Sequence, residues 1–231
     1  MTSASLLAFP DTDEIEEAEL VARLLVPMGQ EAPRRLMQIG ANEGMYEYAK
    51  PDNKDFVFEF LRDHPAWGAL LIEPIPETYD RLVANYAGHS NRLHFLNCAI
   101  TEQVERRVLH VAGRDGKSSS LMGRPTPEDA DVTGIEVACL PPDMALDLVN
   151  WDRADFVKID AEGYDEILVG LLIDSADRAP LPDILLWEQI GPEKRGTSDR
   201  LGALGYRVLR TGHSKKGRCL DRVAIRQELL G

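Results

Sequence analysis

Residues 35–44 read Arg-Leu-Met-Gln-Ile-Gly-Ala-Asn-Glu-Gly, and this stretch decides the fold. Its first half is a short apolar run, which predicts a β-strand that ends at Gly40. Gly40 and Gly44 allow the backbone to turn sharply and to come close to a ligand. Because ligands of open α/β sheets bind beyond the carboxyl ends of the strands, this turn is a candidate ligand site.

Short apolar runs alternate with helical patterns along the rest of the chain. Residues 113–133, rich in Gly, Ser, Pro and charge, are predicted to form a long surface loop. The alternation predicts one α/β domain, a mainly parallel sheet with helices on both faces. The last two strands are joined by a turn too short for a parallel crossover, so the last strand is predicted to be antiparallel. Strands are predicted at 35–39, 69–73, 93–100, 104–111, 155–160, 184–188, 206–210 and 221–226, and helices at 55–62, 76–86, 142–149, 165–172 and 193–204.

The amino-terminal residues predict one helix ahead of this sheet. Asp11 and Glu14 form the pattern of a capping pair, and apolar residues then recur at helical spacing as far as Leu25. Pro27 and Gly29 are predicted to end the helix. The chain is therefore divided into an N-terminal helical extension, residues 1–34, and the α/β domain, residues 35–231.

Composition limits the classes of function. The 231 residues are 44% hydrophobic and 28% charged, with a formal net charge of −13, and this acidity disfavours nucleic acid as a partner. No membrane span and no secretory signal are visible. Cys98, Cys139 and Cys219 are odd in number and widely spaced, which favours free thiols in a reducing compartment. A cytoplasmic protein is predicted, and the sequence makes no prediction of its oligomeric state.

A carboxylate at the end of the second strand narrows the class of ligand. Glu73 could accept hydrogen bonds from both hydroxyls of a ribose, which with the glycine turn indicates an adenosine-containing ligand. A dinucleotide fingerprint needs glycine where Asn42 stands, because the backbone must approach a pyrophosphate, so NAD and FAD are disfavoured. S-adenosylmethionine has no phosphate. Its ammonium and carboxylate groups could be held by loop backbone and by Gln38 and Asn42.

Four motifs in this order resemble the FkbM-type family of S-adenosylmethionine-dependent methyltransferases. The motifs are Gln-Ile-Gly-Ala-Asn-Glu-Gly at 38–44, Leu-Ile-Glu-Pro at 71–74, Asn-Cys-Ala-Ile at 97–100 and Lys-Ile-Asp-Ala-Glu-Gly-Tyr-Asp at 158–165. The resemblance covers residues 35–226. It implies a class I methyltransferase fold, which is Rossmann-like, with S-adenosylmethionine as cofactor and a hydroxyl of a small molecule, such as a sugar or natural product, as acceptor.

The resemblance also implies roles for individual residues. Gly40, Asn42 and Gly44 would line the methionine end of the cofactor, Glu73 would bind its ribose, and residues 97–99 would lie beside its adenine. Many members of the family carry an acid where Gln38 stands, which is a departure from the pattern. The implied cofactor-binding residues are Gln38, Gly40, Ala41, Asn42, Gly44, Glu73, Pro74, Asn97, Cys98, Ala99 and Asp160.

Three carboxylates follow adjacent predicted strands and are the candidate catalytic groups. Asp160 ends strand 155–160, Glu162 lies in the turn that follows it, and Glu188 ends the next strand. A hydroxyl nucleophile is weak unless a base takes its proton, so Asp160 or Glu162 is predicted to accept it, with Glu188 in support. Asp160 or Glu162 could instead only cap the following helix. A divalent cation bound by two or three of these acids is a further alternative, although no metal ligand is predicted.

The predicted function is S-adenosylmethionine-dependent O-methylation of a hydroxylated small molecule. Two alternative hypotheses for the function remain at this point. One is a non-catalytic subunit that binds the cofactor or a partner, and the other is methyl transfer to nitrogen or to protein.

Overall fold

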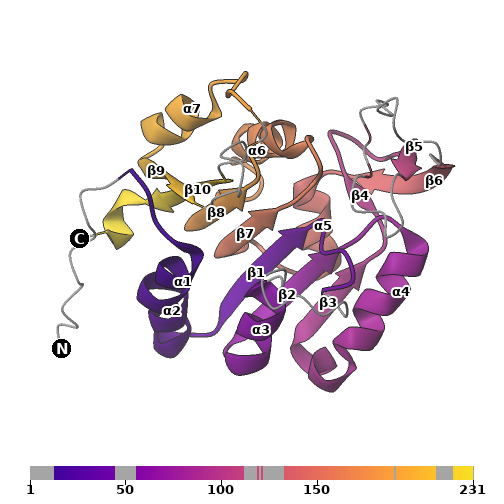
Figure 1. Cartoon of the computed structure of the whole chain (residues 1–231), viewed down its shortest axis with the longest axis horizontal. Coiled ribbons are helices and arrows are strands. Elements are labelled where there is room, and N and C mark those ends of the chain that lie inside the picture. The colour runs from indigo at the N-terminus through magenta and orange to yellow at the C-terminus, as the bar shows by residue number, and fades with distance from the viewer. Residues whose placement is uncertain are drawn as a thin grey trace.

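A seven-stranded sheet forms the centre of the molecule (Figure 1). The structure is a computed structural model that describes residues 13–44, 56–111, 119, 121, 133–189, 191–211 and 221–230. The strand order is β3-β2-β1-β7-β8-β10-β9, in which β10 is antiparallel to both neighbours and the other pairs are parallel. The predicted fold class, with its antiparallel last strand, is confirmed. The strands are β1 (Arg34–Ile39), β2 (Trp67–Ile72), β3 (Leu93–Leu96), β7 (Phe156–Ile159), β8 (Ile184–Trp187), β9 (Tyr206–Thr211) and β10 (Asp221–Arg226).

Helices cover both faces of this sheet because successive strand residues point to opposite sides. Along β8, Ile184 and Leu186 join one buried cluster, whereas Leu185 and Trp187 join the other. The first cluster is completed by α1 (Glu17–Leu20), η1 (Val21–Leu25), α2 (Val26–Glu31), α3 (Phe56–Asp63) and α4 (Pro76–Asn85). The second is completed by α5 (Pro142–Leu148), α6 (Asp165–Asp174) and α7 (Thr197–Ala203). The short 3₁₀ helices are η2 (Ala87–Arg92) and η3 (Gln227–Leu229).

A second sheet corrects the prediction for residues 93–140. It has the order β4-β6-β5, formed by β4 (Ala99–Ile100), β6 (Thr133–Leu140) and β5 (Glu105–Val111). The single strand predicted at 93–100 is wrong, since the chain leaves the large sheet after Leu96 and enters the small one at Ala99. Strand β6 was not predicted, although the alternating apolar residues Ile135, Val137 and Cys139 carry the signal of a half-buried strand.

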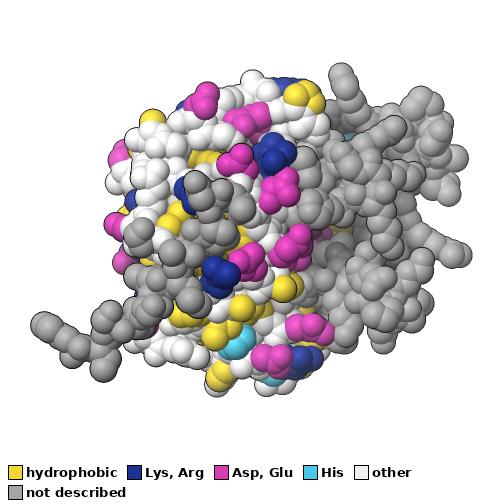
Figure 2. All heavy atoms as spheres, turned by 60° about the vertical axis from the view of Figure 1, so that its left-hand side comes forward, with side chains coloured by type: hydrophobic (Ala, Val, Ile, Leu, Met, Phe, Trp, Pro, Cys, Tyr) yellow, Lys and Arg dark blue, Asp and Glu magenta, His cyan; other side chains and the backbone are white. Residues whose placement is uncertain are grey.

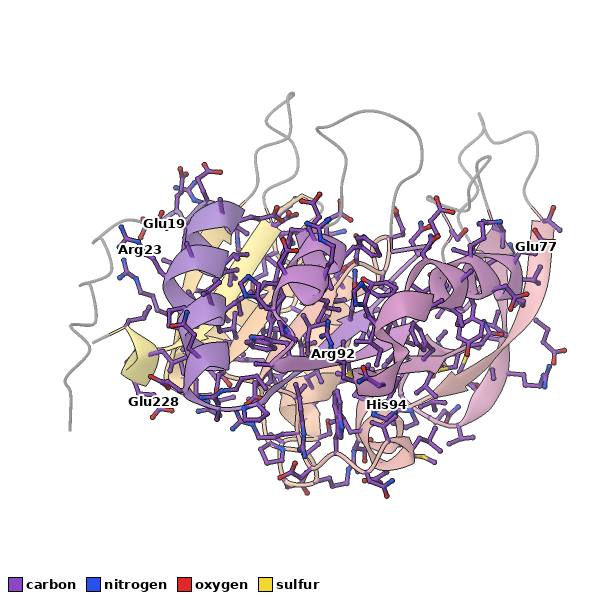
Figure 3. All side chains as sticks on the ribbon, turned by 90° about the horizontal axis from the view of Figure 1, so that it is seen from below. Glu19, Arg23, Glu77, Arg92, His94 and Glu228 are labelled. Carbon is purple, nitrogen blue, oxygen red and sulfur yellow. The ribbon has the colours of Figure 1, made fainter. Side chains whose placement is uncertain are left out.

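The amino-terminal helix begins later than predicted. Its first helical residue is Glu17, and Glu14 instead forms an isolated bridge with Arg210 of β9. Asp11, the other half of the predicted capping pair, lies outside the described residues. Glu19 and Arg23 pair on the outer face of this segment, with 2.9 Å between carboxylate oxygen and guanidinium nitrogen (Figure 3).

Pro27 and Gly29 do not end this helix, contrary to the prediction. Pro27 lies in the first turn of α2, directly after a π-helical turn, and the helix passes through it without a break. Gly29 lets the helix pack on Trp67, because a Cβ there would be 2.5 Å from the indole nitrogen. That nitrogen donates to the Leu25 carbonyl over 3.2 Å. The helix thus continues to Glu31 because it is held against the sheet. The division of the chain at residue 34 stays a prediction.

Helix α7 is shorter at its amino end than the predicted helix 193–204. It begins at Thr197, after Gly196 in the left-handed region with a φ of +61°. Glu193 stays outside the helix, and its carboxylate accepts hydrogen bonds from the Thr197 hydroxyl at 2.8 Å and the Ser198 hydroxyl at 2.6 Å.

Acidic and basic side chains lie side by side on the surface seen in Figure 2. No helix within the described part of the chain has the length and apolar character needed to cross a bilayer.

An ion-pair cluster joins the amino ends of β1 and β8, the segment before β7 and the carboxyl end of the antiparallel strand β10, and it gives a stability prediction. Asp183, before β8, lies 2.6 Å from Arg153, 3.7 Å from Arg226 and 3.8 Å from Arg34. Asp183→Asn would leave these partly buried guanidinium groups short of a counter-charge, so we expect the free energy of unfolding to fall by about 2–3 kcal/mol. Urea denaturation would measure the loss. Asp152→Asn, which removes an exposed partner of Arg35, should change little, and equal losses in both variants would contradict the prediction.

Candidate active site

The glycine turn after β1 and the acid after β2 are joined by a hydrogen bond. The Asn42 N–H donates to Glu73 Oε2 over 2.9 Å, and the Ile75 N–H donates to Glu73 Oε1 over 2.9 Å. Asn42 itself has a φ of +50°, which lets the turn bring its N–H toward the carboxylate. The Glu73 side chain is buried, and this burial raises its pKa to about 7 despite the two backbone donors. The two features are therefore parts of one site.

Close contact between the ends of β1 and β7 fixes the position of the turn. Gly40 has a φ of +79°, and a Cβ at this position would lie 1.9 Å from the Asp160 carbonyl oxygen. The Asp160 N–H donates to the Ile39 carbonyl over 2.9 Å. Strands β2 and β7 lie on opposite sides of β1, so the sheet order reverses here, and a ligand is expected beyond such a point.

A pocket of about 160 Å³ opens at this place. Its walls come from both sheets, since residues after β1, β2 and β7 face residues of β4 and β5 across it. Apolar side chains cover much of the wall, and carboxylates lie at Glu73, Asp160 and Glu162. The lining residues are Ile39, Gly40, Asn42, Ile72, Glu73, Pro74, Ile75, Cys98, Ala99, Ile100, Leu109, Ser119, Leu121, Asp160, Ala161, Glu162, Tyr164 and Leu168.

Tyr164 joins the wall after β7 to the second sheet. Its hydroxyl donates to Glu102 Oε2 over 2.8 Å and accepts from Arg107 Nη1 over 3.2 Å. Arg107 also pairs with Glu102 at 3.0 Å and with Glu105 at 2.6 Å. This network holds β5, and with it Leu109, against the pocket.

The loop from Asp160 to Asp165 presents its acids without using them as helix caps. The N-cap of α6 is Tyr164, which makes no side-chain cap. Asp165 organises the loop instead, since its carboxylate accepts from the Ala161 N–H and the Gly163 N–H, both over 3.0 Å. Glu162 has a φ of +48°, a conformation uncommon for a residue other than glycine. The capping alternative for Asp160 and Glu162 is therefore not what the structure shows.

The pKa of Glu162 is strongly perturbed. Burial, followed by repulsion from Asp160, Glu188 and Asp165, raises it to about 8. Asp160 lies 3.5 Å from Lys158 Nζ. Perturbed acids of this kind in a pocket are typical of functional sites.

Glu188 lies in a neighbouring hollow rather than in this pocket. The hollow, of about 390 Å³, lies between the loops that follow β7 and β8. Burial and then repulsion from Asp160, Asp165 and Asp221 raise the pKa of Glu188 to about 7. The negative charge of Glu188 repels that of Glu162 and contributes to the raised pKa of Glu162. The lining residues of the hollow are Gly163, Asp165, Glu166, Ile167, Glu188, Gln189, Lys194 and Arg195.

The structure divides the predicted cofactor residues into two groups. Gly40, Asn42, Glu73, Pro74, Cys98, Ala99 and Asp160 line the pocket. Gln38, Ala41, Gly44 and Asn97 are outside its lining and support it. Gln38 and Ala41 are buried, and a Cβ at Gly44 would lie 2.5 Å from the Tyr86 ring. The Asn97 amide donates to the carbonyls of Glu73 at 2.8 Å and Pro74 at 3.1 Å, and so holds the ends of β2 and β3 together.

Sequence reasoning assigned no site role to several residues of the pocket wall. Tyr164 lies within the fourth motif, so its place beside Glu162 was a usable signal. Leu109 belongs to a polar strand whose partner β6 was not predicted. Leu121 falls in the predicted loop 113–133. Within the described ranges, no group of three or more His, Cys, Asp or Glu side chains is arranged to hold a metal ion.

A protein-family comparison decides what kind of site this is. The model of the methyltransferase FkbM domain matches residues 38–190. The chain belongs to the FkbM methyltransferase family. This enzyme is therefore an S-adenosylmethionine-dependent methyltransferase, and it acts on a methyl acceptor. A search of curated protein sequences finds no match.

Several solved structures are similar to this methyltransferase at low sequence identity. The METTL16 MTase domain is 12% identical, with 92% of this chain and 70% of that chain covered and a TM-score of 0.48. A putative methyltransferase, yhhF, from Escherichia coli is 14% identical, with coverages of 91% and 83% and a TM-score of 0.47. Fibrillarin from Aeropyrum pernix, in complex with natively bound S-adenosyl-L-methionine, is 9% identical, with coverages of 84% and 67% and a TM-score of 0.45.

The residues of the pocket fit the chemistry of S-adenosylmethionine. The buried Glu73 carboxylate keeps lone pairs beyond those used by its two backbone donors, so it can also accept from ribose hydroxyls. Ile75, Cys98 and Ile100 offer an apolar surface to an adenine ring. The backbone at residues 40–42 is available to the methionine end.

Proposed function

We propose that this methyltransferase transfers a methyl group to a hydroxyl of a small molecule. The observation that carries this proposal is the Glu162 carboxylate on the wall of the cofactor pocket. Its pKa of about 8 is close to the operating pH of most enzymes, which suits a general base. A neutral amine can attack without losing a proton first, whereas a hydroxyl gains much from such a base.

In this mechanism the residues around the pocket have different roles. S-adenosylmethionine, when bound, supplies an electrophilic methyl group on a sulfonium. Glu73 and the turn at residues 40–42 would hold the adenosyl and methionine parts, so that the methyl group faces Asp160 and Glu162. Glu162 would take the proton of the acceptor hydroxyl, with Asp160 as the neighbouring alternative. Glu188 would support the base from the adjoining hollow. Alignment and exclusion of water would supply further acceleration.

The charge of the molecule supports a small acceptor without phosphate groups. The net charge is −13, and acids surround the reacting end of the pocket. Nucleic acid would have to approach against this field. A neutral polyol, by contrast, can donate its hydroxyl protons to the carboxylates.

A labelled-methyl transfer screen would test the acceptor class. Matched pairs of a sugar and its amino analogue would compare oxygen with nitrogen, with and without magnesium, and transfer RNA and a peptide mixture would form two further arms. We expect label on hydroxyl oxygens of small molecules. Label only on amines, RNA or peptide would contradict the proposal.

Glu73→Gln tests the ribose assignment separately from turnover. An amide would lose the charge-assisted hydrogen bonds and oppose one backbone N–H with its own donor, so we expect affinity for S-adenosylmethionine to fall about 10- to 100-fold. Titration calorimetry at pH 8.5, where the Glu73 carboxyl is ionised, would measure it. Glu43→Gln is the matched control, because Glu43 lies in the same turn but pairs with Arg81 at 3.0 Å outside the pocket. Unchanged affinity in Glu73→Gln would refute the assignment.

A further inference from the structure

The described lining residues of the pocket carry an unbalanced set of charges. Among its described lining residues there are three carboxylates, Glu73, Asp160 and Glu162, and no lysine, arginine or histidine. Lys158, which pairs with Asp160, lies outside the lining. A neutral ligand can donate hydrogen bonds to these carboxylates but gains no attraction between opposite charges, whereas a cation gains both.

The three carboxylates differ in how they are held. Glu73 accepts two backbone N–H groups, which offset part of the cost of burying its charge. No hydrogen bond or ion pair joins the Glu162 side chain to another described residue. Its negative charge is thus opposed by burial and by other acids, and little in the described protein offsets it. Asp160, Glu188 and Asp165 act on Glu162 by repulsion. Asp221 and Lys158 act in turn on Glu188, and Asp160 and Arg81 act on Glu73.

We propose that Asp160 and Glu162 make the pocket select the positively charged sulfonium cofactor over its demethylated product. This inference rests on the proposed cofactor site. S-adenosylmethionine and S-adenosylhomocysteine share the adenosine and amino-acid parts, so Glu73 and the glycine turn act on both alike. They differ at the sulfur, which is a cation in the first and neutral in the second. The negative charges of Asp160 and Glu162 attract the sulfonium of the first ligand but not the neutral sulfur of the second.

The charge balance of the reaction links this preference for the cationic cofactor to the release of the product. The acceptor oxygen forms its bond to the methyl carbon as the carbon–sulfur bond breaks, and the sulfur keeps the electron pair and becomes neutral. The hydroxyl proton passes to Glu162. One positive charge leaves the sulfur and one proton neutralises the carboxylate, so the net charge inside the pocket is unchanged. When Glu162 returns this proton to solvent, its restored negative charge favours exchange of the product for new cofactor.

Binding of three ligands would test the selection without turnover. The ligands are S-adenosylmethionine, S-adenosylhomocysteine and sinefungin, an analogue that carries an ammonium group near the sulfur position. Titration calorimetry of the native protein at pH 6.5 and pH 9 would give their dissociation constants. We expect both cationic ligands to bind at least about tenfold more tightly than the product at pH 9, a difference of 1.4 kcal/mol. The preference should shrink at pH 6.5, where Glu162 is largely protonated.

Glu162→Gln should reduce the preference to less than about threefold and remove its dependence on pH, while product affinity is kept or improved. Glu77→Gln is the control, since Glu77 is exposed on α4 (Figure 3) and outside the pocket, yet its loss changes the net charge equally. Product binding as tight as cofactor binding at pH 9, or a preference unchanged in Glu162→Gln, would overturn the inference and leave the cofactor site intact. Binding of none of the three ligands by folded protein would overturn the cofactor site as well.

Discussion

Replacing Gly40 with alanine is expected to abolish measurable binding of S-adenosylmethionine. The added Cβ would lie 1.9 Å from the Asp160 carbonyl oxygen, which is backbone and cannot rotate away as a side chain could. The φ of +79° adds strain for any residue with a Cβ. Strands β1 and β7 would have to separate at the point where the pocket forms. We expect affinity to fall by more than about 100-fold and stability by about 2–4 kcal/mol.

Gly202→Ala is the matched control for this substitution. Gly202 lies in α7, and a Cβ there meets no atom within 4 Å, so alanine should leave binding unchanged and slightly stabilise the helix. Titration calorimetry and thermal unfolding would be measured on both variants. A Gly40→Ala protein that binds the cofactor with native affinity would show that the turn does not shape the site.

The second large effect is expected at Glu162. Replacing the proposed base by glutamine in Glu162→Gln should lower kcat by about 10²- to 10⁴-fold. The native enzyme should show kcat/KM rising with pH up to about 8, because the carboxylate acts as a base only after it loses its proton. The variant should lack this acidic limb. Steady-state rates between pH 6 and pH 10, with an acceptor found in the transfer screen, would measure both properties.

The Glu188→Gln variant distinguishes the proposed base, Glu162, from the residue proposed to support it, Glu188. Glu188 lies in the neighbouring hollow and acts on Glu162 through its charge, so its loss should shift the acidic limb to lower pH and lower kcat by less than about tenfold. A larger loss of kcat in Glu188→Gln than in Glu162→Gln would indicate that Glu188 is the base and Glu162 the supporting residue. An acidic limb that persists in Glu162→Gln would point to Asp160 as the base.

The sequence by itself predicted where the candidate site lies along the chain. Gly40 ends one apolar strand, Glu73 follows a second and Asp160 follows a third, and alternating strands and helices place such strand ends at one edge of a parallel sheet. Local patterns suffice for this result, because strand periodicity and glycine turns depend on neighbouring residues. The same local reasoning placed the end of the first helix at Pro27, since it could not include the packing of α2 on Trp67.

Only the tertiary structure decided which residues form the walls of the pocket and how its acids ionise. Strand β6 pairs with β4 and with β5, and Tyr164 contacts Glu102 over 62 positions of sequence. Asp165, rather than Asp160 or Glu162, organises the loop through two backbone N–H groups. The raised pKa of Glu162 comes first from burial and then from repulsion by Asp160 and Asp165 of its own loop and by Glu188, which follows the neighbouring strand β8. Desolvation and repulsion depend on distances between segments far apart in the chain, and these distances exist only once the sheets have packed.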